Sequence, residues 1–429
     1  MATTLLKDEL KNGSLSSSSS IRTISALWKA TIEYQEDGVF DSTAIYELRR
    51  RCNPRIANRD IFNVISAVYA DEYWDVIKMS PSILAKRIVQ SGVIKYYEEA
   101  LKAAQDAMSQ WRGILCRKNL SDTGHIPSIG SYSKSIDIVC NGDTELIPAQ
   151  LIENWNSAFW KEPKVGKNFI YVRVQNKDFV GGLDGIVTMF YTEGGFNQPP
   201  SSWIQCYTSE GNKREGSILL LEGEKGLLNK GERGVSEAFF FNPTSTEHVC
   251  VIAAIKDQFF KKNDPTKISS NWDSTIWITH NAAAAWHNYD PQKSQVTKLK
   301  VYNQDGIKEK FLLKGECRNV PKGYTISLKT EDGIINSGEV VVYENNQFIE
   351  TGFELPGYYN GFVDVEIKGP KGELLPQESA LELTLLWELP KGHSCYFKAV
   401  EVFNELKATK NESAIFTSLG SYTIIGKEN

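Results

Sequence analysis

Two segments in the middle of the chain constrain the fold most. In Asn168–Asn176, every second residue from Ile170 to Val174 is β-branched, as one buried face of a sheet requires. The segment Val249–Ile255 is apolar at every position, which is typical of a central strand covered on both faces. The segment His280–Asn288 fits a further strand. Together they predict an antiparallel β-sandwich.

The same part of the chain carries four strand signatures. They read NFIYVRVQN, a strand ending in MFYT, FFFNP followed by EHVCVIAAI, and NAAAAWHN. These segments resemble the immunoglobulin-like accessory domain of bacterial secreted and surface proteins, which is close to the CARDB-type adhesion modules. The resemblance covers about residues 136–290 of this sequence. It implies an immunoglobulin-like β-sandwich and a role in adhesion.

Composition and periodicity divide the chain into five parts. Residues 1–20, with an unbroken serine run, predict a flexible tail. Helical periodicity over 21–118 predicts a bundle, and the Ser-, Gly- and Pro-rich segment 119–135 predicts a linker. Residues 136–291 and 295–429 predict two successive β modules. The expected class is therefore α+β and multidomain, with an N-terminal helical bundle followed by two immunoglobulin-like antiparallel β-sandwich domains.

The second module is predicted from alternation and turn signals. Leucines alternate with polar residues from Leu381 to Trp387, which is the pattern of a half-buried strand. The pair Asn345-Asn346 tolerates positive φ and stands between two predicted strands, Glu339–Tyr343 and Gln347–Glu350. This arrangement predicts a hairpin.

One predicted helix carries a heptad seam. Apolar residues, Ala104 among them, recur at spacings of three and four from Ile94 to Leu115. The seam consists of Ile94, Tyr97, Leu101, Met108, Trp111 and Leu115. An internal contact of a bundle is favoured over an intermolecular coiled coil because the run is short. Assembly into a homo-oligomer stays open.

Charge and cysteine usage exclude some functions. The net charge is −5, which argues against a nucleic-acid-binding surface. The seven cysteines are scattered, so we expect reduced thiols rather than a disulfide framework. The first residues lack the apolar core of a Sec signal, and no apolar run is long enough for an integral membrane segment. We therefore expect cytoplasmic synthesis, with any release following a non-classical route.

The sequence predicts no catalytic, metal or cofactor site. His280 and His287 are seven residues apart and lie near Asp290, a spacing that favours ordinary strand-end histidines over a metal site. Asp178 and Asp184 favour a solvated turn over a calcium loop. No phosphate loop, dinucleotide fingerprint or hydrolase motif occurs.

Aromatic residues beside Asn, Pro or Gly are the candidate binding residues, because aromatic rings give a large contact area at low entropic cost. They are Trp155, Phe159, Trp160, Tyr358 and Tyr359. For Trp277, Trp286 and Trp387 we expect core positions instead.

These observations favour a non-enzymatic structural or interaction protein that presents β-sandwich modules to a protein or glycan partner. A toxin-like protein that binds cells or forms pores is the alternative. An enzyme of unrecognised type is the third interpretation.

Overall fold

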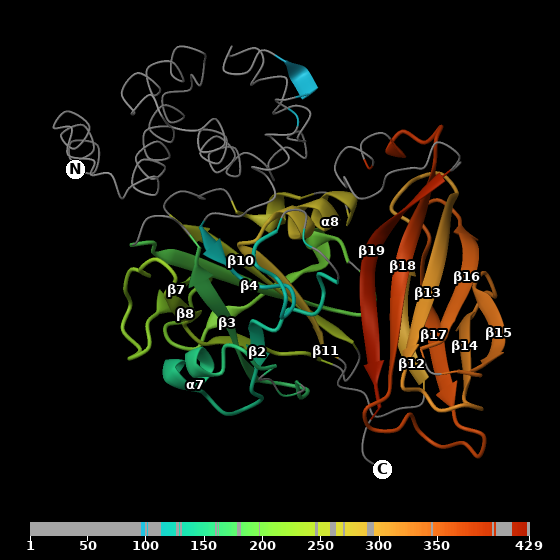
Figure 1. The fold of residues 1–429 in the computed structure, drawn as a ribbon, viewed down its shortest axis with the longest axis horizontal. Coiled ribbons are helices and arrows are strands. Elements are labelled where there is room, and N and C mark those ends of the chain that lie inside the picture. The colour runs from blue at the N-terminus through green and yellow to red at the C-terminus, as the bar shows by residue number, and fades with distance from the viewer. Residues whose placement is uncertain are drawn as a thin grey trace.

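The computed structural model describes residues 96–98, 101, 113–125, 128, 131–158, 161, 163–177, 182–196, 198–244, 248–257, 263–268, 271–289, 296–344, 346–396, 399 and 414–426. This part of the chain is built mainly of antiparallel strands, with two α-helices, α7 (Pro148–Glu153) and α8 (Asn271–His280) (Figure 1). The predicted α+β class with a helical bundle is therefore wrong for the chain that the structure describes. Most of the predicted bundle lies outside these residues.

Residues 113–289 form the first β unit. Its long strands are β3 (Asn168–Asn176), β4 (Gly185–Glu193), β10 (Val249–Asp257) and β11 (Ala284–Tyr289). The shorter strands are β1 (Ile114–Leu115), β2 (Ile138–Cys140), β5 (Ile204–Gln205), β6 (Tyr207–Thr208), β7 (Gly216–Leu219), β8 (Arg233–Ser236) and β9 (Phe239–Phe241). Two 3-10 turns, η1 (Pro200–Ser202) and η2 (Pro265–Lys267), complete it.

The first β unit is one hydrogen-bonded sheet rather than two separate ones. Its order is β11-β10-β4-β7-β8-β3-β9-β6, with β1 and β2 paired to β3 and β5 paired to β4. Apolar side chains of β3, β4 and β10 belong to one hydrophobic cluster, so the sheet encloses a common core. Every residue of β10 from Val249 to Ile255 is buried, as its apolar run predicts.

The expected strands of this unit agree with the structure in part. β3 has the predicted bounds. The signature FFFNP begins with strand β9, which pairs with β3, and the separate strand β8 before it pairs with β3 as well. The expected strand from His280 is wrong at its start, because His280 ends helix α8 and β11 begins at Ala284.

Residues 296–426 form the second sandwich, which has two four-stranded sheets. One sheet has the order β12 (Val296–Tyr302), β17 (Asn360–Lys368), β14 (Thr325–Thr330) and β15 (Asn336–Val341). The other has the order β16 (Phe348–Leu355), β13 (Glu309–Arg318), β18 (Ala380–Pro390) and β19 (Ala414–Ile425). A sandwich predicted from alternation is thus confirmed.

The predicted hairpin around Asn345-Asn346 is wrong. β15 pairs with β14 and β16 pairs with β13, so the turn carries the chain from one sheet to the other. Asn346 has a φ of 64°, which is the positive value expected of Asn in a turn. Turn chemistry predicted the bend correctly, but the pairing depends on which sheet each strand joins.

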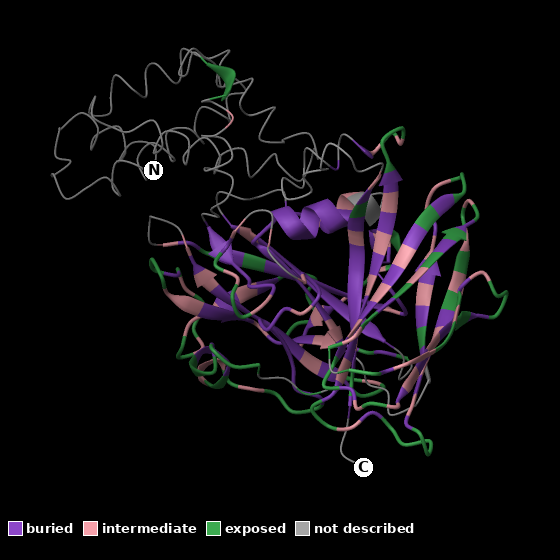
Figure 2. Ribbon diagram, turned by 45° about the vertical axis from the view of Figure 1, so that its right-hand side comes forward, coloured by how far each residue is buried: buried purple, intermediate pink, exposed green. Residues whose placement is uncertain are grey.

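Helix α8 lies between the first β unit and the second sandwich (Figure 1). Its residues from Ser274 to His280 are all buried (Figure 2). Ile276 belongs to the core of the second sandwich, whereas Trp277 and Ile278 belong to the core of the first β unit. Because α8 is covered on all sides, its polar and apolar residues are not separated onto two faces. Its sequence therefore shows no helical periodicity.

The first β unit also covers two edge strands of the second sandwich. Phe196 donates its backbone N–H to the carbonyl of Lys300 on β12 at 3.1 Å. Gly195 is required here, because a Cβ at this position would lie 1.9 Å from the carbonyl oxygen of Lys300. On the other edge, the hydroxyl of Ser133 donates to the carbonyl of Ser421 on β19 at 3.1 Å.

An ion-pair network spans the same interface. Glu382 of β18 accepts Lys134 of the first β unit at 2.6 Å and Arg318 of β13 at 2.6 Å. Lys134 and Ser133 lie in the segment 119–135 that the sequence predicts as a linker, and Ser133 and Ser135 are buried. The domain boundaries themselves stay a prediction.

We predict that Ile276→Ala lowers the free energy of unfolding by about 2–4 kcal/mol, because it leaves a cavity where α8 enters the sandwich core. Ile186→Ala, at an exposed position of β4, is the matched control. Urea denaturation measures both changes. Equal, small effects of the two substitutions would contradict the role of α8.

Candidate functional site

Three loops meet at one end of the second sandwich. The pairings Tyr302↔Asn360, Thr330↔Val363 and Glu309↔Leu355 bring the ends of their strands together. We call residues 303–308, 331–335 and 356–360 the aromatic tip. It contains Tyr358 and Tyr359, two of the binding residues predicted from the sequence.

Tyr358 has an unusual backbone conformation. Its φ is 57° and the residue is 76% exposed. Positive φ in a bulky residue is an outlier that costs of the order of 1–3 kcal/mol and persists only where the surroundings enforce it. An exposed ring contributes little to the core that would offset this cost, so Tyr358 stands out as a functional candidate.

Two neighbouring loops hold Tyr358 in this conformation. Its N–H donates to the carbonyl of Asp305 at 2.8 Å. The Asn303 side-chain amide donates to the carbonyls of Ile307 at 2.8 Å and of Pro356 at 3.0 Å, which ties the two loops together. A Cβ at Gly306 would lie 2.9 Å from the Tyr358 hydroxyl oxygen, so the ring rests against the glycine backbone. The ring is therefore fixed before any partner binds.

Tyr359 and Asp332 add a polar side to the tip. The Tyr359 hydroxyl donates to the Asp332 carboxylate at 2.8 Å, and the Thr330 hydroxyl donates to the same group at 2.6 Å. The hydrogen bond from Thr330 lowers the pKa of Asp332, whereas burial and the nearby carboxylate raise the pKa of Tyr359 to about 12. The tip thus combines a fixed aromatic surface with an ionised carboxylate.

The other predicted binding aromatics lie elsewhere. Trp155 is 4% exposed, so its predicted exposure is wrong. It follows α7 and packs under the guanidinium of Arg117, whose Cζ is 3.7 Å from the ring centroid. Phe159 and Trp160 lie outside the described residues. Trp277, Trp286 and Trp387 are buried, as predicted.

The predicted heptad seam is described only in part. Tyr97 and Leu101 are helical, and Tyr97 is exposed. The prediction that Leu115 lies in the helical seam is wrong, because Leu115 lies in strand β1 and is buried against β3. Ile94, Met108 and Trp111 lie outside the described residues.

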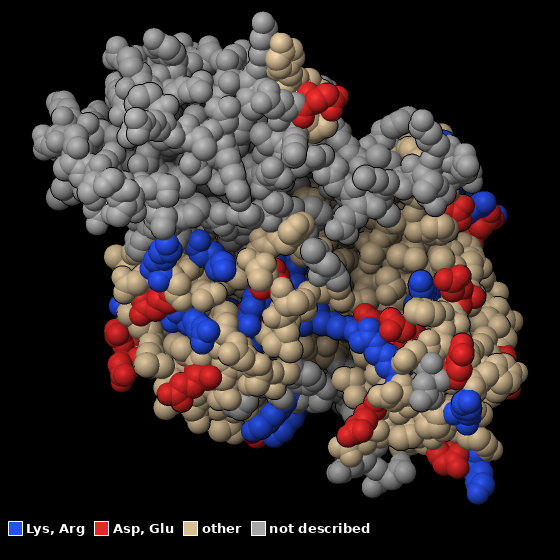
Figure 3. All heavy atoms as spheres, viewed as in Figure 1, with Lys and Arg blue, Asp and Glu red and all other residues tan. Residues whose placement is uncertain are grey.

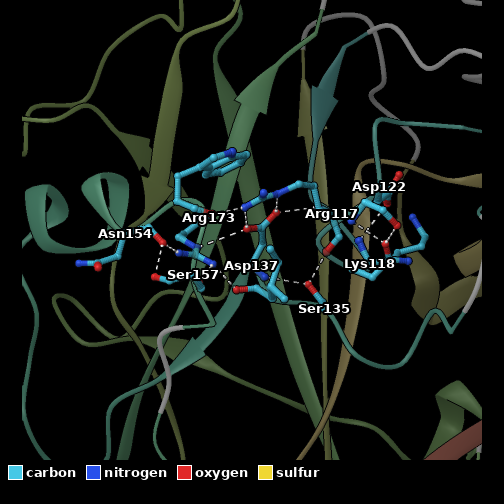
Figure 4. A network of polar contacts seen from close by, with 12 residues as sticks. Arg117, Lys118, Asp122, Ser135, Asp137, Asn154, Ser157 and Arg173 are labelled. Carbon is cyan, nitrogen blue, oxygen red and sulfur yellow. Dashed lines mark hydrogen bonds and ion pairs between the residues drawn. The ribbon is translucent and has the colours of Figure 1, made fainter.

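A buried charge network holds β1, β2 and β3 together (Figure 4). Asp137 accepts Arg117 at 2.7 Å and lies 3.3 Å from the guanidinium of Arg173. Asp137 and Arg173 are fully buried. The excess positive charge is held by carbonyls, since Arg117 donates to Trp155 at 2.6 Å and Arg173 to Ser157 at 3.1 Å. Alternation predicts burial only for the β-branched face of this strand, and Arg173 lies on the other face, so the sequence missed this network.

Lys118 is a further buried cation, beside the two arginines of the network (Figure 4). Its ammonium donates to the carbonyls of Asn281 at 2.9 Å and Ala284 at 3.3 Å. Burial lowers its pKa, which the nearby Asp122 opposes. These contacts fasten the start of the unit to the segment between α8 and β11, so they serve structure.

The buried pair His248 and Cys250 is not arranged for nucleophilic catalysis. Their Nε2 and Sγ atoms are 3.1 Å apart, which resembles a base beside a nucleophile. Burial lowers the pKa of His248 to about 3 and raises the pKa of Cys250 to about 12, so both groups stay neutral. A reactive cysteine requires the thiolate and access to substrate.

The histidines considered for a metal site are separated by the fold. His280 ends α8, where its Nδ1 lies 3.1 Å from the carbonyl of Ile276, and His287 lies in β11 against the ring of Tyr289. Asp290 and Asp178 lie outside the described residues. Within those residues, no group of three or more His, Cys, Asp or Glu side chains is placed to hold a metal. No helix of the described chain is long and apolar enough to cross a membrane.

Charged side chains of both signs are interspersed on the face shown in Figure 3.

Comparisons with known proteins find no matching family model and no matching curated protein. Among solved structures, a secreted serine protease of Vibrio cholerae is 10% identical, with 49% of this chain and 45% of the protease covered and a TM-score of 0.18. The collagen adhesin of S. aureus is 8% identical, with coverage of 61% and 88% and a TM-score of 0.16. The adhesin CfaE of enterotoxigenic E. coli is 7% identical, with coverage of 75% and 94% and a TM-score of 0.16.

The chain thus spans less than half the length of the protease. The described chain consists mainly of strands, as the resemblance implies, whereas no CARDB-type family model matches. TM-scores this low carry no argument about activity, so the proposal below rests on the geometry of the tip.

We predict that Asp137→Asn lowers the free energy of unfolding by about 3–5 kcal/mol, because it leaves two buried guanidinium groups without a counter-charge. Asp143→Asn breaks the exposed pair with Lys164 and should leave stability unchanged. Chemical denaturation of both variants tests the difference. Equal stabilities would show that the carbonyl groups alone satisfy the arginines.

We also predict that stability falls as the pH drops below about 6.5, the unperturbed value for histidine. Burial lowers the pKa of His248 to about 3 and of His287 to about 4 in the folded protein. Between these values and 6.5, the unfolded chain binds protons that the folded chain does not, so each histidine contributes a slope of about 1.4 kcal/mol per pH unit. Urea midpoints from pH 7 to pH 5 should show a shallower decline for His287→Gln than for the wild type. Parallel declines would contradict a neutral His287.

Proposed function

We propose that this chain is a non-enzymatic interaction protein whose second sandwich presents the aromatic tip to a protein or glycan partner. The observation that carries the proposal is the backbone of Tyr358, which holds an exposed ring at positive φ. Strain of this kind is characteristic of ligand-binding loops, because the scaffold bears its cost and the partner meets a fixed surface.

The composition of the tip supports this role. Tyr358 and the exposed Ile307 give apolar contact area, while Asp332 and the Tyr359 hydroxyl give hydrogen-bonding groups. A rigid aromatic ring with polar groups around it suits the stacking and hydrogen bonding that recognise sugars, and equally suits a protein interface. The neutral, buried state of His248 and Cys250 supports the non-enzymatic part of the proposal.

Tyr343 offers a matched control. It is 72% exposed and lies at the opposite end of the same sandwich, between β15 and β16. We predict that Tyr358→Ala weakens binding at least about tenfold, as expected when a central aromatic contact is lost, whereas Tyr343→Ala keeps wild-type binding. The measurement is binding to arrays of immobilised glycans and purified proteins.

A second variant separates binding from folding. Tyr358→Gly removes the ring and relieves the positive φ, so it should lose binding without losing thermal stability. Wild-type binding by both Tyr358 variants would sink the proposal, as would a wild type that binds no glycan and no protein.

A further inference from the structure

The edges of the second sandwich are treated unequally. The edge strands β12 and β19 are covered by the first β unit through the contacts of Phe196 and Ser133. On the far side the edges are β15 and β16, which lie away from the first β unit (Figure 1). Within the described residues, no strand pairs with the outer edge of either one.

β15 carries features that discourage further pairing. Its register with β14 shifts between Ser327 and Lys329, and Gly338 within it has a φ of 64°. Irregularities of this kind protect exposed edges. β16 carries none of them: it pairs with β13 without a shift from Phe348 to Leu355 and contains no proline. β16 is therefore the regular open edge of this sandwich.

Hydrogen bonding fixes which residues of β16 face outward along the sheet. Cys317 donates its N–H to the carbonyl of Gln347 at 2.8 Å, so these two residues form a hydrogen-bonded pair. Because such pairs alternate in an antiparallel ladder, the next residue, Phe348, directs its backbone groups to the open edge, and every second residue after it does so too. The residues with free edge groups are thus Phe348, Glu350, Gly352 and Glu354.

The side chains beside this edge are neutralised within the sandwich. Glu350 pairs with Lys314 at 3.8 Å, and Glu354 pairs with Lys308. The exposed Phe348 lies under Lys314, whose ammonium is 4.8 Å from the ring centroid. On the inner face, Ile349 and Phe353 are buried, with Thr351 between them. A strand added here would meet an apolar inner face and no uncompensated charge.

We propose that β16 pairs antiparallel with β16 of a second copy of this chain, with Thr351 opposite Thr351. In this register Glu350 faces Gly352 and Phe348 faces Glu354, and both are pairs of residues with free edge groups. Ile349 then faces Phe353 on the inner face. The four-stranded sheet that contains β16 in one copy thereby joins the same sheet of the second copy.

Charge selects this register among those that satisfy the hydrogen bonds. Moving the second strand by two residues one way places Glu350 opposite Glu354, and moving it the other way places Glu350 opposite itself. Like charges directly opposite each other destabilise a sheet. Gly352 leaves space for any side chain, because a Cβ there would meet no atom within 4 Å.

The test uses substitutions at Gly352. In the symmetric pair, Gly352 of each copy faces Glu350 of the other copy, so one substitution changes two contacts. Gly352→Lys places opposite charges together and should strengthen the dimer, whereas Gly352→Glu places like charges together and should weaken it. We expect dissociation constants that differ by about tenfold or more, measured by sedimentation velocity up to hundreds of micromolar. Thermal unfolding checks that both variants are folded.

Thr351→Cys tests the register directly. Non-hydrogen-bonded partners have Cα atoms about 4.5 Å apart, which permits a disulfide. Mild oxidation should therefore give a covalent dimer of Thr351→Cys, and not of the wild type or of Tyr343→Cys. A wild type that stays monomeric overturns the proposal. Binding of a different protein to β16 would not rescue it, because the proposed partner is a second copy of this chain. A dimer that both Gly352 variants change in the same direction, or that Thr351→Cys does not cross-link, also overturns it.

Discussion

The edge of a β-sheet carries unpaired N–H and C=O groups, and the way this chain covers its edges organises the molecule. Helix α8 and the loop at Phe196 close one side of the second sandwich. Because Ile276 and Trp277 of one helix enter two different cores, neither β unit can move away without exposing apolar surface. Covering an edge and joining the two units are therefore the same interaction.

Burying charged groups in the first β unit is costly unless they are paired and hydrogen-bonded. Asp137 lies between two arginines, and backbone carbonyls accept hydrogen bonds from Nη2 of Arg117 and from Nη2 of Arg173. Such a network stabilises little on balance, because desolvation offsets the attraction between the charges. It does fix the relative positions of β1, β2 and β3.

The tip of the second sandwich is held by contacts of its own. Asn303 and Gly306 allow two loops to approach closely and hold Tyr358 at positive φ. Aromatic residues beside Asn, Pro or Gly were predicted as binding candidates, and Tyr358 is indeed exposed. Trp155 has similar neighbours in the sequence but is buried, because Arg117 comes from a distant segment to cover it. Local sequence cannot distinguish these two tryptophan- and tyrosine-bearing loops.

The sequence by itself determined the bounds of β3, the burial of β10 and the bend at Asn346. Only the tertiary structure decided the pairing of β15 and β16, the helix at α8, the burial of Arg173 and the strain at Tyr358. The physical reason is common to all four. Periodicity records which side of an element faces the core, whereas α8 and Arg173 are enclosed on every side, and strand partners and loop strain are set by segments distant in the chain.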